Sequence, residues 1–232
     1  MKLRIQFEKL GPIRFTSHKD VVRIFQRCFA AGGVPIHFSE GFHPHMRMSF
    51  GPPLKTGWES HAEYMDINVS QPVGEFTHAC NELLPAGLRV THVAPLSDRA
   101  LKLANDLSAV ELEITIQAKD AFTGDAPTNG RRNERLQPLA QDINARFSQP
   151  EADDTPRVTR AEVCDEGDRI AVKYTSTMIE GRIVVPAELV GATIGDPESF
   201  EEPLRVTRIA QYVERSGELV SPVSKGVIRA TS

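Results

Sequence analysis

Cysteine, long apolar runs and an excess of charge of one sign are all scarce in this chain of 232 residues. The three cysteines, Cys28, Cys80 and Cys164, lie far apart in the sequence, so a secreted disulfide framework is not expected. Iron–sulfur ligation needs several thiolates, usually closely spaced, which this chain does not supply. No apolar run approaches the roughly 20 residues that cross a bilayer, and no apolar leader opens the chain. We therefore expect a cytoplasmic protein with no membrane contact and no cofactor.

The net charge of −4 argues against indiscriminate nucleic-acid binding, but it hides an asymmetry along the chain. Residues 1–60 contain nine Lys or Arg and four acidic residues, a net charge of +5, so the remainder carries −9. All seven histidines also fall within the first 92 residues. This difference predicts a local anionic partner for the basic N-terminal part.

The apolar periodicity of the first hundred residues predicts alternating strands and helices. Residues 2–8 alternate in polarity like a strand with one buried face, and Ser17 with Asp20 is typical of a helix cap. A helix is expected to follow as far as Gly32-Gly33, and a second one near 76–84. With the strands expected near 46–50, 64–69 and 88–93, the order is the split βαβ, or ferredoxin-like, pattern. Its two helices would cover one face of a four-stranded antiparallel sheet and leave the other face open.

The second half of the chain is predicted to repeat this plan, which makes the protein α+β with two tandem ferredoxin-like halves and antiparallel sheets. Residues 120–132 are polar and broken by Gly and Pro, so they are expected to form a flexible connection. We expect an N-terminal domain over residues 1–97, a second half over 98–214, and a flexible tail over 215–232.

The predicted helix that begins after Ser17 has a basic stripe. Lys19, Arg23 and Arg27 stand at i, i+4 and i+8, opposite the apolar face, and Arg14 precedes them. Such a stripe is either a solvated helix face or a contact for phosphates or an acidic partner. Two of its three residues are Arg, which suits bidentate phosphate contacts better than Lys does.

Residues 39–60 are rich in Gly and Pro and form a long loop, a feature that is usually functional or disordered inside a compact domain. Phe42 and Phe50 are candidates to stack on a base, while His45 and Arg47 are candidates to meet phosphate. The alternative is a rigid loop that packs its own aromatic side chains. The two interpretations are compatible, because a rigid loop can still display a site.

The histidines of this loop leave a metal site open as a minor alternative. His43 and His45 supply two imidazoles, His18 or His61 would complete a set of three, and zinc is the default metal for such ligands. No acidic residue stands at a diagnostic offset. A histidine pair is also able to do general acid/base work on RNA. The chain has no glycine-rich nucleotide-binding motif.

Several spaced motifs together resemble a known family. They are Arg14-Phe15-x-Ser17-His18-x-Asp20-x-x-Arg23, Ser39-x-Gly41-Phe42-x-Pro44-His45, Ser49-Phe50-Gly51-x-Pro53-Leu54, and Gly57-x-x-Ser60-x-x-Glu63-Tyr64-x-Asp66. Over about residues 1–95 the chain resembles the radical-SAM-linked protein family of the DUF2344 type. It departs from the pattern at Lys19, usually Leu, and at His43, commonly Asn. The resemblance implies association with a radical-SAM protein, but it implies no reaction.

Three functions follow as hypotheses. The first is an accessory or substrate-recognition protein that works with a radical-SAM enzyme and binds RNA or another anionic partner. The second is a protein-interaction scaffold that docks on that enzyme through Met46, Met48 and Trp58. The third is an enzyme, either a small metal-independent ribonuclease that uses His18 or His45, or a small hydrolase with bound zinc; the catalytic residues are not assigned beyond this choice. The residues expected to bind RNA or another ligand are Arg14, His18, Arg23, Arg27, Phe42, His45, Arg47 and Phe50.

Overall fold

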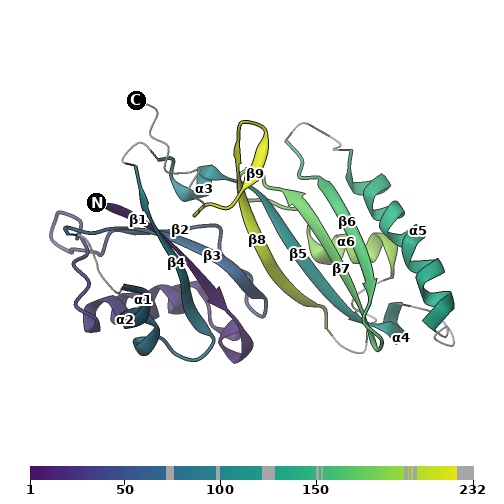
Figure 1. Ribbon diagram of the computed structural model, residues 1–232, viewed down its shortest axis with the longest axis horizontal. Helices are drawn as coiled ribbons and strands as arrows, with labels where there is room; N and C mark the ends of the chain where they lie inside the picture. The colour runs from purple at the N-terminus through teal and green to yellow at the C-terminus, as the bar shows by residue number, and fades with distance from the viewer. Residues whose placement is uncertain are drawn as a thin grey trace. The chain divides into compact units, whose positions relative to one another are not determined.

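The computed structural model of the protein describes residues 1–71, 76–97, 100–121, 129–149, 152, 154–195, 198, 200 and 203–223 (Figure 1). The chain forms two compact units. The first contains residues 1–107 and 210–232, and the second contains residues 108–209. The predicted segments 1–97, 98–214 and 215–232 have other bounds. The difference arises because the last long strand, β8 (Arg205–Arg215), begins in the second unit and ends in the first.

The first unit has the chain order β-α-β-β-α-β. Its elements are β1 (Lys2–Lys9), the 3₁₀ turn η1 (Gly11–Phe15), α1 (His18–Ala31), β2 (Met48–Phe50), β3 (Glu59–Asn68), α2 (Phe76–Leu83) and β4 (Leu88–Leu96), followed by α3 (Leu103–Asp106) and, after β8, by β9 (Glu218–Val220). Strand β1 lies between β4 and β3 and pairs antiparallel with both, while β2 pairs antiparallel with β3. β9 pairs with the end of β8.

Large apolar residues stand at every second position of β1, which explains why helices cover one face of this sheet. Leu3, Ile5 and Phe7 all point to the same side, where they pack with Phe25 and Phe29 of the amphipathic helix α1. Figure 1 shows α1 and α2 together on this side of β1, β3 and β4. The expected antiparallel strands, the two helices and the cap at Ser17 are therefore confirmed.

The opposite face of the sheet is closed in its middle, so the prediction of an open face is wrong there. Arg4 has no exposed surface, and Tyr64 and Asp66 are also buried. Arg4 donates from Nε and Nη2 to the Asp66 carboxylate, at 2.8 and 3.1 Å, and from Nη1 to Asp106 of α3 at 2.8 Å. Arg215 of β8 pairs with Asp106 as well. The sheet is closed here because its buried charges need buried partners.

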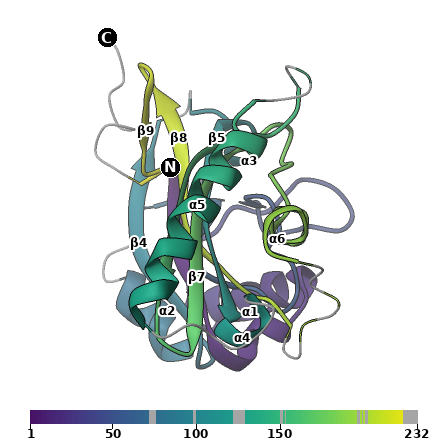
Figure 2. The same cartoon turned by 90° about the vertical axis from the view of Figure 1, so that its right-hand side faces the viewer.

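The second unit also combines strands with helices. It contains β5 (Leu107–Gln117), α4 (Ala118–Ala121), α5 (Asn129–Phe147), β6 (Val158–Asp165), β7 (Arg169–Thr177), α6 (Pro186–Thr193) and the first part of β8. Strand β7 pairs antiparallel with β5 and with β6, and β8 is the neighbour of β5 on its other side. Helix α5 packs against β6 and touches α6, as Figure 2 shows from the side of this unit.

The fold is α+β, as predicted, and its described residues form nine strands and six α-helices. Parts of the two segments predicted to be flexible belong to regular elements: residues 129–132 lie in α5, and residues 218–220 form β9. Residues 122–128 of the expected connection and 224–232 of the expected tail lie outside the described residues.

Replacing Arg4 with alanine is expected to lower the free energy of unfolding by about 3–5 kcal/mol, because two buried carboxylates lose their shared cation. Urea denaturation measures the loss. Arg23→Ala is the control, since Arg23 forms an exposed ion pair with Asp20 at 3.2 Å and its loss should cost less than about 1 kcal/mol. Equal losses in the two variants would contradict this view of the Arg4 network.

Candidate functional site

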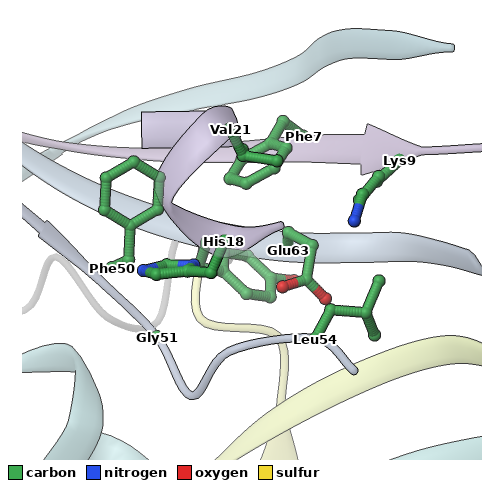
Figure 3. Close-up of a pocket in the computed structure, with 9 residues that line it drawn as sticks. Phe7, Lys9, His18, Val21, Phe50, Gly51, Leu54 and Glu63 are labelled. Atoms are coloured by element: carbon green, nitrogen blue, oxygen red, sulfur yellow. The ribbon is translucent and has the colours of Figure 1, made fainter. Parts of the chain in front are cut away.

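A pocket opens at the end of the helix-covered face of the first unit (Figure 3). Strands β1 and β3, the start of α1 and the segment after β2 all contribute to it. The residues that line it are Phe7, Lys9, His18, Val21, Phe50, Gly51, Leu54, Glu63 and Tyr64. Two of these side chains are of opposite charge and nearly completely buried, Lys9 with 2% of its surface exposed and Glu63 with 8%.

Strand periodicity places both charges in this pocket. Lys9 continues the alternation of Ile5 and Phe7 on β1, and Glu63 continues that of Met65 on β3. Phe7 faces Glu63 across the two strands, and the pairing shifts between Phe7 and Lys9. Both charged side chains therefore share the face on which their neighbours form the apolar core. Figure 3 shows the Lys9 amino group and the Glu63 carboxylate directed into the same space.

The ammonium group of Lys9 is held by the turn that precedes α1. Its Nζ donates to the backbone oxygens of Thr16 at 2.8 Å and of Arg14 at 3.2 Å. Burial lowers the pKa of Lys9, and the negative charge of Glu63 acts in the opposite direction. Lys9, a residue of the pocket lining, therefore also binds the backbone of the turn that precedes α1.

The first turn of α1 positions His18. The Ser17 hydroxyl accepts from the Asp20 backbone N–H at 3.2 Å, and the Asp20 carboxylate accepts from the Ser17 backbone N–H at 3.3 Å, which completes a capping box. The hydrogen bond from the Ser17 hydroxyl lowers the pKa of Asp20, and Arg23 contributes further. The His18 ring meets the Phe50 ring edge to face, with centroids 5.3 Å apart. The cap therefore fixes the helix turn that places His18 at the pocket.

The structure brings His18 and Phe50 together, out of the eight residues predicted to bind RNA or another ligand. Arg14, in the η1 turn, is not among the residues that line the pocket and has other partners. Its Nη1 pairs with Glu59 at 3.3 Å, and its guanidinium stands 4.6 Å from the centroid of Phe15. Arg23 and Arg27 are exposed on α1. Their closeness to the loop residues stays a prediction.

The remaining three of the eight predicted residues, Phe42, His45 and Arg47, lie on a hairpin between α1 and β2. Phe38 and Met46 form an antiparallel β-bridge at its base. The Ser39 N–H donates to the backbone oxygen of His45 at 2.8 Å, and the His45 N–H donates to the Ser39 hydroxyl at 2.9 Å. The Arg47 N–H donates to the backbone oxygen of His37, also at 2.8 Å. Phe42 stands at the tip of this hairpin and is 102% exposed. The side chains of His45 and Arg47 are exposed too.

The described ranges contain no group of three or more His, Cys, Asp or Glu side chains placed to hold a metal ion. His43 and His45 are both exposed, and neither gains a third ligand within these ranges.

Cys28 and Cys80 are distant in sequence but meet between α1 and α2, where the Cys28 thiol donates to the backbone oxygen of Cys80 at 3.6 Å. A hydrogen bond with Cys28, together with burial, raises the pKa of the Cys80 thiol. The pair belongs to the apolar core.

Reasoning from the sequence missed Lys9 and Glu63 as site residues, although a signal was present. Each stands at the end of an apolar alternation, on one of two strands that the ferredoxin-like pattern makes neighbours. A charge that continues a buried face must find a partner, and the partner is expected on the adjacent strand. Glu63 was recognised only as a family motif residue.

The fold and the pocket define an α+β protein in which three separated sequence motifs converge. His18 comes from the first motif, Phe50, Gly51 and Leu54 from another, and Glu63 and Tyr64 from a third. The chain belongs to the DUF2344 family, whose model, described as an uncharacterized protein conserved in bacteria, matches residues 2–159. No curated protein matches the chain. None of the described helices is long and apolar enough to span a bilayer.

Replacing Ser17 with alanine is expected to remove the α1 cap, at a cost of about 1 kcal/mol in stability. The pKa of Asp20 should rise toward its ordinary value of 3.8, because the main cause of its lowering is lost. An NMR titration of the Asp20 carboxyl measures this change.

The pH dependence of stability follows from the lowered pKa of Asp20. Its stabilising effect is complete above the unfolded value of 3.8 and is lost as the pH falls through the lower folded value. The acid-side loss should therefore be smaller in Ser17→Ala than in the wild type. Ser17→Thr, which keeps the hydroxyl, should behave like the wild type. An Asp20 titration that is the same in all three proteins would contradict the assignment.

Proposed function

We propose that this protein is an accessory or substrate-recognition protein that binds RNA, through the hairpin that carries Phe42 and the basic face of α1. The observation that supports this most directly is Phe42, a large apolar side chain that is fully exposed on a backbone-bonded hairpin. A phenyl ring that is exposed to solvent in this way is suited to stack on an unpaired base. Such stacking depends little on which base it is, because every base has a flat aromatic face.

The charges around Phe42 suit an anionic chain. His45 and Arg47 are exposed on the same hairpin, while Lys19, Arg23 and Arg27 are exposed on α1. The stretch of residues 1–60 that contains both elements has a net charge of +5. Phosphate contacts supply affinity without sequence preference, and an aromatic ring adds a contact with a base.

The partnership with a radical-SAM protein is part of this proposal, and it rests on the family resemblance. In such a pair the partner carries the iron–sulfur chemistry, and this chain presents the substrate. We place the pair in the cytoplasm, because Cys28, Cys80 and Cys164 are free thiols.

We further propose that each unit is a ferredoxin-like half. The second unit repeats the chain order β-α-β-β-α-β through β5, α5, β6, β7, α6 and β8. Its strand order, β8-β5-β7-β6, has the same form as β4-β1-β3-β2 in the first unit. The fold by itself does not supply the function.

The scaffold hypothesis loses part of its proposed contact surface. Met46 and Met48 are partly buried and pack against the core of the first unit, and Trp58 is half-buried. A small His-dependent ribonuclease remains a second candidate because of one observation, the position of His18 at the same pocket as Glu63. RNA cleavage that is lost in His18→Ala would favour that candidate.

Replacing Phe42 with alanine is expected to weaken the binding of single-stranded RNA roughly tenfold, since stacking on one base is lost. Fluorescence anisotropy with a labelled 12-nucleotide RNA measures the change. Leu83→Ala is a matched control, because Leu83 is also an exposed apolar side chain but lies on α2. Binding that is unchanged in Phe42→Ala, or equally weakened in both variants, would contradict the role of the hairpin.

The double variant Arg23→Ala, Arg27→Ala is expected to bind the same RNA more weakly and to show a smaller salt dependence. Each lost phosphate contact should reduce the slope of log K against log salt by about 0.7 for a single strand. Arg146→Ala with Arg160→Ala removes two exposed arginines from the second unit and serves as the control. An unaltered slope in the first double variant would argue against α1 as a phosphate contact.

A further inference from the structure

A second phenylalanine of the first unit faces solvent and has no part in the contacts described so far. Phe15 is the last residue of the η1 turn and is 63% exposed; among the described phenylalanines only Phe42 is more exposed. It belongs to the first of the spaced sequence motifs, the one that continues into α1. Single exposed apolar side chains are common on proteins, so the exposure of Phe15 matters only together with the way in which it is held.

The backbone on both sides of Phe15 is held by a buried ammonium group. Lys9 Nζ donates to the backbone oxygens of Arg14 and Thr16, at 3.2 and 2.8 Å. These two residues flank Phe15 in the chain. The Thr16 hydroxyl and the Thr16 N–H also donate to the backbone oxygen of Ile13, at 2.7 and 3.0 Å. Because Lys9 is 2% exposed, its hydrogen bonds are shielded from water, and the turn that carries the ring is fixed.

The Phe15 ring itself is braced by a guanidinium. Arg14 Cζ lies over the ring, 4.6 Å from its centroid, and Arg14 Nη1 pairs with Glu59 at 3.3 Å. The Gly57 N–H donates to the backbone oxygen of Arg14 at 2.9 Å. The exposed ring is therefore already ordered in the free protein, so a ligand that stacks on it loses little free energy in ordering it.

The two exposed rings belong to opposite ends of the first unit. The Gly11 N–H of the η1 turn donates to Glu59, the first residue of β3, at 2.7 Å. The hairpin of Phe42 joins the other end of β3, where Ile36 and Val69 form an antiparallel bridge. Helix α1 connects the turn to the hairpin, and its 14 residues make it about 21 Å long.

The helix between the two rings has a basic surface. Lys19, Arg23 and Arg27 are exposed on it. Residues 14–27 contain four Lys or Arg and one acidic residue, a net charge of +3. A nucleic-acid strand with stacked bases has one phosphate about every 3.4 Å, so about six nucleotides span α1. Cations along a strand and aromatic rings under its bases are the combination by which proteins bind single-stranded nucleic acid.

We propose that Phe15 is a second base-stacking contact for single-stranded RNA, and that the bound strand follows α1 from the η1 turn to the hairpin of Phe42. The inference rests on the proposed function and deepens it. It assigns the protein a footprint of about eight nucleotides, because about six span the helix and one more stacks at each ring. Arg14 is a positioning residue behind Phe15, since its charge is paired with Glu59.

Replacing Phe15 with leucine is expected to weaken binding of the labelled 12-nucleotide RNA roughly tenfold, because the side chain stays apolar but loses its flat ring. Fluorescence anisotropy measures the change. Phe15→Tyr keeps the ring and should bind like the wild type. Leu101→Ala is the matched control, because Leu101 is 57% exposed in the same unit and should have no effect. A thermal melt of each variant shows that it is folded.

The double variant Phe15→Leu, Phe42→Ala tests whether one strand contacts both rings at once. Contacts this far apart should act independently, so the double variant is expected to lose about a hundredfold in affinity. If a strand used one ring at a time, each single variant would lose less than about twofold, because the other ring would remain available. Single losses this small would overturn the proposed path along α1.

The length of the RNA tests the footprint on the unmodified protein. Affinity for uridine strands of four to 12 nucleotides should rise up to about eight nucleotides and change little beyond that length. A plateau that is already reached at four nucleotides would contradict a strand that spans the helix.

The outcomes separate this inference from the proposed function. Binding that is weakened in Phe42→Ala but unchanged in Phe15→Leu overturns the inference, while RNA recognition by the hairpin stands. The reverse result supports Phe15 as a base contact and overturns the role of the hairpin. RNA binding that neither substitution changes overturns both contacts, and a wild type that binds no RNA overturns the inference together with the proposed function.

Discussion

The first unit depends on a guanidinium that is buried inside its sheet. Arg4 has no exposed surface, and it joins Asp66 of β3 to Asp106 of α3, while Lys2 reaches Asp66 at 3.4 Å and Arg215 of β8 reaches Asp106. Burial alone would lower the pKa of Arg4, but the hydrogen bonds and charges of the two aspartates outweigh it and raise the pKa. The group is therefore charged at any physiological pH, and the segments that supply its partners must stay in place.

This network and the pocket lie on opposite faces of the same two strands. Arg4 on β1 and Asp66 on β3 point to one face, while Lys9 on β1 and Glu63 on β3 point to the other. A one-residue slip between β1 and β3 would turn every one of these side chains to the wrong face. The buried ion pairs on one side thus help to keep the register that forms the pocket on the other.

The candidate RNA surface and the pocket differ in how the chain supports them. The hairpin of Phe42 is held by backbone hydrogen bonds, and the side chains of Phe42, His45 and Arg47 on it are exposed. His18 and Phe50, by contrast, are held by a capped helix and by ring contacts that reach Phe7 and Phe25 in the core. The hairpin suits contacts that tolerate variation in the partner, whereas the surroundings of the pocket are fixed by the core.

Local patterns in the sequence were sufficient to predict most elements of the first unit. The alternation of Leu3, Ile5 and Phe7 predicted β1, and the Ser17–Asp20 cap predicted the start of α1, because these signals act between residues close together in the chain. What the tertiary structure decided is which distant groups meet: Arg4 with Asp106, Cys28 with Cys80, and Lys9 with Glu63. The physical reason is that a buried polar group takes whichever partner the packing of strands and helices brings to it, and that packing depends on the whole unit rather than on the neighbouring sequence.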